Sequence, residues 1–206
     1  MNALDVASEL YNTVHEHGLH GIELEFRLGH VVGDTFLSKV TEASFKKIEA
    51  YIQSLDTVDR TIRIHTSEKI HNQVKHITTL SLEEHGETKP PPPLSCMQKI
   101  RAYTGNFAVK GSPYTIRCAI SREQVVTNSP PPPPNEVCLV REKIRTRYIS
   151  GCWAYDLTQV TSNTDEETVH EVELELIDPE ILFHTPMDVV AQDALFKMHQ
   201  LLKHVE

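Results

Sequence analysis

Hydrophobic and polar residues alternate along much of the chain, which is the pattern of a β-strand with one buried face. The clearest example is GIELEFRLGH, residues 21–30, where Ile, Leu and Phe alternate with Glu and Arg. Further segments that read as strands lie at about 58–66, 69–80, 96–104, 114–123, 136–149, 152–161 and 168–178. Eight strands can close into a barrel, and the recurring polar face predicts a wet, charged interior.

Apolar residues recur at helical spacing in three other segments. The first two helices are predicted at 4–16 and 42–55. The third begins at Thr185-Pro186-Met187-Asp188, with Thr185 as N-cap and Pro186 in the first helical position, and it continues to about Leu202. The chain therefore predicts a mainly β (α+β) domain spanning 1–206, with helices at the N-terminus, after the first strand and at the C-terminus.

Two runs of consecutive prolines, at 90–93 and 130–134, interrupt the predicted strands. Proline cannot lie inside a helix or a central strand, so both runs are predicted to be exposed, extended loops. Because a strand-like segment follows each run, a stiff connector between strands is favoured over a docking site for a proline-binding partner.

Composition adds limits on location and partners. The formal net charge of −9 argues against non-specific nucleic-acid binding over a broad surface, but leaves room for a local anion site. No apolar run is long enough to cross a membrane, and the N-terminal segment is too polar for a signal peptide, so we expect a soluble, intracellular protein. The four cysteines form no C-x-x-C pair and are predicted to be reduced thiols in strands.

Carboxylates gather on one face of two predicted strands. The segment HEVELELID, residues 170–178, places three glutamates on one side, as 21–30 places two. Neighbouring carboxylates on such a face lie about 6.7 Å apart, and at an effective dielectric near 20 they repel by roughly 2 kcal/mol. Either strand alone fits a solvated face. Together they offer five carboxylates, an oxygen ligand set that suits Mg²⁺ or Mn²⁺.

Cations gather on a further strand. In VREKIRTRY, residues 140–148, every second side chain from Arg141 to Arg147 is basic. An exposed edge strand protected by charge would explain these cations but not the glutamates. Other inward candidates are Arg63, Lys99, Arg101, Arg117, Ser121 and Glu123. Inside a closed sheet these groups would bind a divalent ion and a polyanion together, as phosphoryl transfer to water requires.

The order of these motifs resembles the metal-dependent RNA 5′-triphosphatases of fungi, protozoa and large DNA viruses, the capping-type members of the triphosphate tunnel metalloenzymes. The matching motifs are E-x-E at Glu23 and Glu25, R-x-S ending in glutamate at Arg117, Ser121 and Glu123, R-x-K-x-R at Arg141, Lys143 and Arg145, D-L-T at Asp156, Leu157 and Thr158, and E-x-E-x-E at Glu171, Glu173 and Glu175. They span most of the chain. The sequence differs from the family at Ala154, where relatives often carry a basic residue, and at Arg27, where they often carry lysine.

The resemblance implies an eight-stranded antiparallel tunnel with the reaction inside. It implies direct metal ligation by Glu23, Glu25 and Glu175, water held by Glu171 and Glu173, and a nucleophilic water oriented by Glu123. The γ-phosphate would be gripped by Arg63, Lys143 and Arg145, with support from Lys99, Arg117 and Arg141. Asp156 would fix a neighbouring cation through a salt bridge.

The implied function is removal of the γ-phosphate from triphosphate-ended RNA, the first step of mRNA capping, with Mg²⁺ or Mn²⁺ as cofactor. Hydrolysis of nucleoside triphosphates with Mn²⁺ would accompany it, and a guanylyltransferase is a candidate partner. The expected location is the nucleus, or a virion or viral factory. Two alternatives stay open: hydrolysis of tripolyphosphate or another small triphosphate by the same tunnel chemistry, and a tunnel that has lost catalysis and binds a partner.

Overall fold

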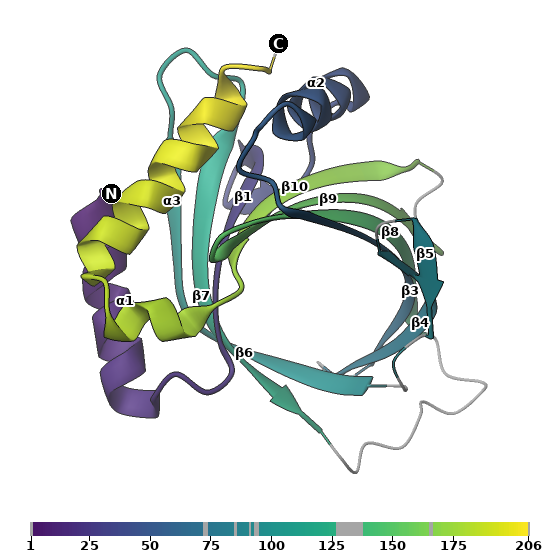
Figure 1. Cartoon of the computed structure of the whole chain (residues 1–206), viewed down its shortest axis with the longest axis horizontal. Coiled ribbons are helices and arrows are strands. Elements are labelled where there is room, and N and C mark those ends of the chain that lie inside the picture. Colours follow the sequence, from purple (N-terminus) through teal and green to yellow (C-terminus); the bar gives the residue numbers. More distant parts are fainter. Residues whose placement is uncertain are drawn as a thin grey trace.

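Eight antiparallel strands close into a barrel in the computed structural model, which describes residues 2–71, 74–84, 86–90, 92, 95–126, 138–164 and 167–205. In order around the barrel these strands are β1 (Ile22–Val32), β10 (Val169–Leu176), β9 (Trp153–Ser162), β8 (Leu139–Ser150), β3 (Arg60–His71), β4 (Val74–Glu84), β6 (Ser95–Ala108) and β7 (Thr115–Val125). The barrel is closed because β1 pairs with both β7 and β10. Figure 1 looks along its axis. The closed eight-stranded barrel predicted from the sequence is confirmed.

Two short strands extend the barrel sheet and were not predicted. The strand β2 (Thr35–Leu37) forms a hairpin with the end of β1, and β5 (Glu87–Lys89) pairs with β4. The helices are α1 (Ala3–His17), α2 (Glu42–Gln53) and α3 (Met187–Leu202), and a 3₁₀ helix, η1 (Pro179–Phe183), precedes α3. The second helix follows β1 and its hairpin strand β2, so it lies after the first strand as the sequence predicted.

Local sequence sets where the helices begin. In α1 the side chain of Asn2 accepts hydrogen bonds from the first turn, and Asp5 accepts one in return. The prediction that Thr185 caps α3 is wrong. Its backbone N–H donates to the Ile181 carbonyl, so it completes the turn after η1. The helix begins one residue after Pro186, whose carbonyl accepts the first helical hydrogen bonds.

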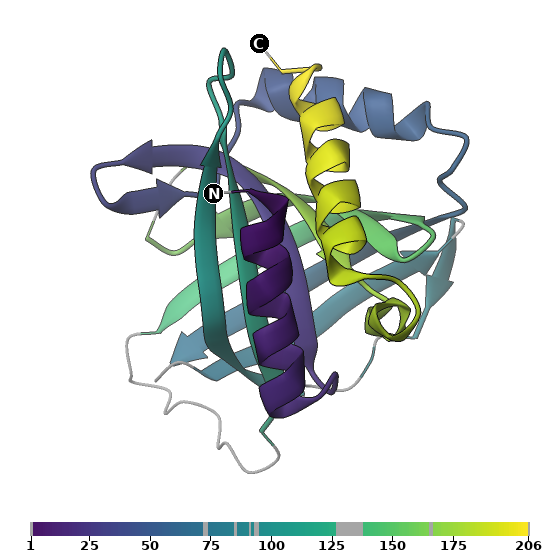
Figure 2. The same ribbon diagram turned by 90° about the vertical axis from the view of Figure 1, so that its left-hand side faces the viewer.

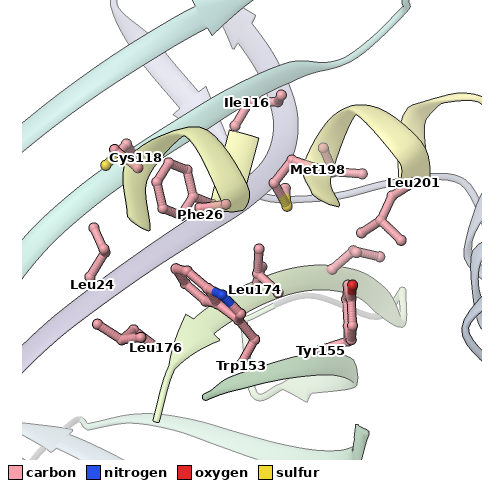
Figure 3. Packing of buried hydrophobic residues seen from close by; sticks show 14 of the residues in the cluster. Leu24, Phe26, Ile116, Cys118, Trp153, Tyr155, Leu174, Leu176, Met198 and Leu201 are labelled. Carbon is pink, nitrogen blue, oxygen red and sulfur yellow. The ribbon is translucent and has the colours of Figure 1, made fainter. Parts of the chain in front are cut away.

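The hydrophobic core lies outside the barrel, between its wall and the helices (Figures 1 and 2). The apolar faces of β1, β7, β9 and β10 meet α3, as Figure 3 shows for Phe26, Leu174 and Met198, which are completely buried. Each such side chain contributes about 1.5–3 kcal/mol of hydrophobic free energy. Because successive side chains on a strand point to opposite faces, this packing turns the polar face of the same strands into the barrel.

Several expectations concern the surface and the thiols. All four cysteines are free, although only Cys96 and Cys118 lie in strands. The proline run at 130–134 lies outside the described residues, and of the run at 90–93 only Pro90 and Pro92 are described. In the part of the chain that the structure describes, we find no helix with the length and apolarity needed to span a bilayer.

Candidate active site

The strand register brings the charged faces together inside the barrel. Glu25 of β1 lies opposite Glu175 of β10, and Arg27 lies opposite Glu173. On the other side of β1, Arg27 lies opposite Arg117 of β7. Residues directly opposite each other in an antiparallel pair point to the same face. Since the alternate residues of β1 fill the helix-covered core, these charged side chains face the tunnel.

Carboxylates dominate one end of the tunnel. Lys99 of β6 forms ion pairs with Glu23 and with Glu25. The distance from Lys99 Nζ to Glu25 Oε1 is 3.1 Å. Burial, reinforced by the charges of Glu25 and Glu123, raises the pKa of Glu23 to about 7 despite Lys99. Burial also raises the pKa of Glu175 to about 7, although Arg147 is its ion-pair partner. Both carboxyl groups therefore hold a proton more readily than ordinary glutamates, in spite of the cations beside them.

Arginines and glutamates alternate at the centre of the tunnel. Arg27 donates from Nη2 to Glu25 Oε2 at 2.8 Å, and its Nε is 2.9 Å from Glu173 Oε1. Arg145 lies 3.6 Å from the other oxygen of Glu173. Burial alone would raise the pKa of Glu173, but Arg27 and Arg145 outweigh it and lower this pKa to about 2. Glu173 is thus a permanent anion.

Asp156 of β9 orients two arginines of β8. Its side chain is completely buried and accepts from Arg145 Nη1 at 2.9 Å, from Arg147 Nε at 2.8 Å and from Arg147 Nη2 at 2.6 Å. Arg145 also donates to the hydroxyl of Thr158. Arg147 belongs to the basic row at 140–148, but the sequence alone predicts no specific role for it. The structure makes it the link between Asp156 and Glu175.

Two further ion pairs line the tunnel. Arg141 donates to Glu171 at 2.8 Å, and the ammonium of Lys143 lies 3.0 Å from Glu68 of β3. Burial lowers the pKa of Lys143, and the negative charge of Glu68 offsets only part of this decrease. Burial would raise the pKa of Glu68, but Lys143 and then Lys75 lower it. Sequence reasoning missed Glu68 and Lys75, because their strands show no regular alternation that would have marked an inward face.

Arg63 is the predicted phosphate ligand that the structure does not bring into the tunnel. It lies opposite Thr146 of β8, whereas the inward Arg145 lies opposite Ile64, and its side chain is exposed. The prediction that Arg63 faces the tunnel is wrong. A register difference of one residue turns a side chain to the opposite face, and the register of this weakly alternating strand could not be set from the sequence. On the neighbouring strand Lys75 has the inward orientation, since it lies opposite Met97, two residues before Lys99.

The remaining predicted residues lie at the two ends of the barrel. Glu123 of β7 is opposite Lys99 and lines an open pocket together with Glu23 and Glu175. At the other end, Arg117 donates to Asn106 Oδ1 at 2.9 Å. The tunnel thus has an acidic mouth and a mouth bordered by arginine.

The donor set at the acidic mouth suits a divalent cation. Glu23 Oε2 and Glu25 Oε1 are buried, and the ammonium of Lys99 is their shared partner. Within the described residues no group of three or more His, Cys, Asp or Glu side chains has the spacing of a bound metal. Glu23 and Glu25 pair with Lys99, and Glu175 pairs with Arg147. Carboxylate oxygens are nevertheless the ligands that Mg²⁺ and Mn²⁺ prefer.

A closed antiparallel barrel with inward rows of carboxylates and cations defines a triphosphate tunnel protein. Residues 30–194 match the family described as mRNA capping enzyme, beta chain, and the chain belongs to this family. The chain is 27% identical over 185 residues to the 5′ RNA triphosphatase of Paramecium bursaria Chlorella virus 1. This match covers 86% of each chain. The chain is therefore an RNA 5′-triphosphatase of the mRNA capping type, in a family of metal-dependent enzymes.

Solved structures of low sequence identity share the fold. The S. pombe Pct1 RNA triphosphatase superposes with a TM-score of 0.75 at 16% identity, covering 99% of this chain and 93% of that one. The Mimivirus capping enzyme triphosphatase gives a TM-score of 0.58 at 14% identity, covering 98% and 96%. The family, fold and activity expected from the motifs are confirmed.

Proposed function

We propose that the tunnel removes the γ-phosphate of triphosphate-ended RNA and leaves a diphosphate end for capping, with Mg²⁺ or Mn²⁺ as cofactor. The observation that supports this most is the meeting of three carboxylates, Glu23, Glu25 and Glu175, with the basic row of β8 inside one closed barrel. The cofactor would be held by these three carboxylates. When bound, it would neutralise charge on the phosphate oxygens.

The basic side chains grip the phosphates. Arg145 and Lys143 would contact the γ-phosphate, supported by Arg141, Arg117 and Lys99. Asp156 fixes the guanidinium of Arg145 before substrate arrives, so little reorganisation is needed when charge develops on the phosphate oxygens. Guanidinium and ammonium groups of this kind stabilise the transferring phosphoryl group mainly through electrostatics.

Carboxylates position the water that attacks. Glu123 lies at the acidic mouth near Glu23 and would orient the nucleophilic water, with Glu171 and Glu173 accepting hydrogen bonds farther inside. Because its pKa is about 2, Glu173 remains an acceptor and cannot take a proton at neutral pH. The new bond joins the water oxygen to the γ-phosphorus, and the bond from the γ-phosphorus to its bridging oxygen breaks, which leaves inorganic phosphate and a diphosphate end.

The test is release of labelled γ-phosphate from triphosphate-ended RNA, with and without Mg²⁺ or Mn²⁺. We expect metal-dependent release by the wild type and loss of release in Glu23→Ala. Glu142→Ala is the matched control, because Glu142 is an exposed carboxylate on the opposite face of the same strand as Lys143. Equal activity of Glu23→Ala and Glu142→Ala would refute the assignment of the acidic mouth.

The same chemistry would act on free nucleoside triphosphates, since the groups described so far contact only polyphosphate. Parallel assays with tripolyphosphate and with a nucleoside triphosphate in Mn²⁺ measure how far RNA is preferred. A guanylyltransferase would be the partner that uses the diphosphate end. For the fold relative Pct1, a complex with the Spt5 CTD has been solved.

A further inference from the structure

The hairpin of β1 and β2 projects beyond one end of the barrel (Figure 2). Its inward residue Phe36 lies opposite Val31 and folds back over the tunnel face of β1. A Cβ atom added at Gly29 would lie 2.6 Å from Cζ of the Phe36 ring. Because glycine has no side chain, the Phe36 ring can pack against the backbone of β1 at this position.

Arg117 fixes the orientation of this ring. Its guanidinium carbon lies 4.2 Å from the centroid of the Phe36 ring, within the range of a cation–π contact. Arg117 in turn donates to Asn106, so ring and guanidinium are held as one unit at the tunnel mouth. A large aromatic side chain that is only partly buried here has no evident role in the core, which lies on the other face of β1.

The ring borders an open pocket of about 460 Å³, lined also by Leu37, Ser38, Lys39, Glu167, Val169 and Glu171. The pocket borders the tunnel face, because Glu171 belongs to the inward row of β10 and pairs with Arg141. The hydroxyl oxygen of Ser38 is buried and has no hydrogen-bond partner among the described residues. An unsatisfied buried hydroxyl is unfavourable unless a further group pairs with it. Aromatic, cationic and hydroxyl groups thus meet at one mouth.

We infer that Phe36 is the platform on which the first nucleobase of the RNA stacks, and this rests on the proposed function. The acidic mouth repels a polynucleotide, while the other mouth carries Lys39, Arg117 and, paired with Glu171, Arg141. Gly29 lies four residues from Glu25 along β1, about 13 Å. An extended triphosphate with its ribose spans a comparable length, so a γ-phosphate near Glu25 places the base at Phe36.

Stacking of a base on an aromatic ring is sequence-tolerant, because every base has a π-face. Phe36 would therefore favour an RNA end over tripolyphosphate without selecting the first nucleotide. The Ser38 hydroxyl is placed to pair with a hydroxyl of the terminal ribose.

The experiment compares two triphosphate-ended oligoribonucleotides that differ only in whether the first nucleotide carries a guanine or is abasic. For the wild type we expect removal of the base to raise KM by roughly five- to a hundredfold. For Phe36→Ala we expect a similarly raised KM with the guanine substrate and no further rise with the abasic one. Such a cycle isolates the interaction between ring and base.

Three further variants separate stacking from structure. Phe36→Trp retains an aromatic face and should keep the base dependence, whereas Phe36→Leu retains apolar volume and should lose it. Val32→Ala is the matched control, since Val32 is 61% exposed on the same hairpin. An active wild type whose KM does not depend on the base, or a Phe36→Leu variant that keeps the dependence, overturns the inference. Absence of phosphate release from both substrates would instead refute the proposed function.

Discussion

Replacing Asp156 by asparagine tests whether the arginines of the tunnel are held in place before substrate binds. The substitution keeps the side-chain volume but removes the charge that Arg145 and Arg147 share. Removing one partner of a buried ion pair costs about 3–5 kcal/mol. The two arginine side chains are 26% and 20% exposed, so water partly replaces the lost partner. We therefore expect a loss of about 3 kcal/mol in the free energy of unfolding.

The measurement is urea unfolding followed by the fluorescence of Trp153, which is buried and donates to Asp193. For a chain of this size the loss corresponds to a fall of roughly 6–12 °C in Tm. Asp56→Asn, at an exposed turn, is the control and should change stability by less than about 0.5 kcal/mol. A loss below about 1 kcal/mol for Asp156→Asn would show that the arginines do not depend on this carboxylate.

Two other predictions follow from the geometry of the tunnel. Because Lys143 lowers the folded-state pKa of Glu68, the stability that this carboxylate contributes is present above its ordinary pKa of about 4.3 and is lost as pH falls through the lower folded value. Glu68→Gln should thus lose less unfolding free energy than the wild type on going from about pH 6 to about pH 3, and equal losses would contradict this. Gly29→Ala should cost about 1–3 kcal/mol, because the added methyl group meets the Phe36 ring and the Leu37 carbonyl. Unchanged urea unfolding would show that the hairpin moves away freely.

The sequence predicted the inward residues where the opposite face of the strand is strongly apolar. In β1 and β10 the residues between the glutamates, such as Leu24 and Leu174, are completely buried, so the alternation of the sequence and that of the structure agree. The prediction that Arg63 faces the tunnel was wrong because β3 has no row of buried apolar side chains that would have set its register. The three-residue strands β2 and β5 are too short for alternation to mark them.

Ion-pair partners on neighbouring strands could not be predicted, because they depend on the register in which the strands pair. The sequence suggested that Asp156 would hold a cation, but not that Arg145 and Arg147 share it. The ion pair of Lys143 with Glu68 joins β8 to β3, which are far apart in the chain. The hairpin that carries Phe36 has a sequence signal, the two-residue Gly33-Asp34 loop, but the packing of the Phe36 ring against Gly29 has none.

Placement of the core on one flank makes the barrel mechanically uneven. Among the described residues between Ile52 and Phe107, no hydrophobic side chain is buried, so β3 and β4 rely on backbone hydrogen bonds and ion pairs. Regions without apolar support open locally at a lower free-energy cost than the rest of a protein. The tunnel therefore has a rigid wall that carries Glu25 and Glu175 and a compliant wall that carries Glu68. We therefore expect the width of the bore to vary more on the side of Glu68, while Glu25 and Glu175 stay in register.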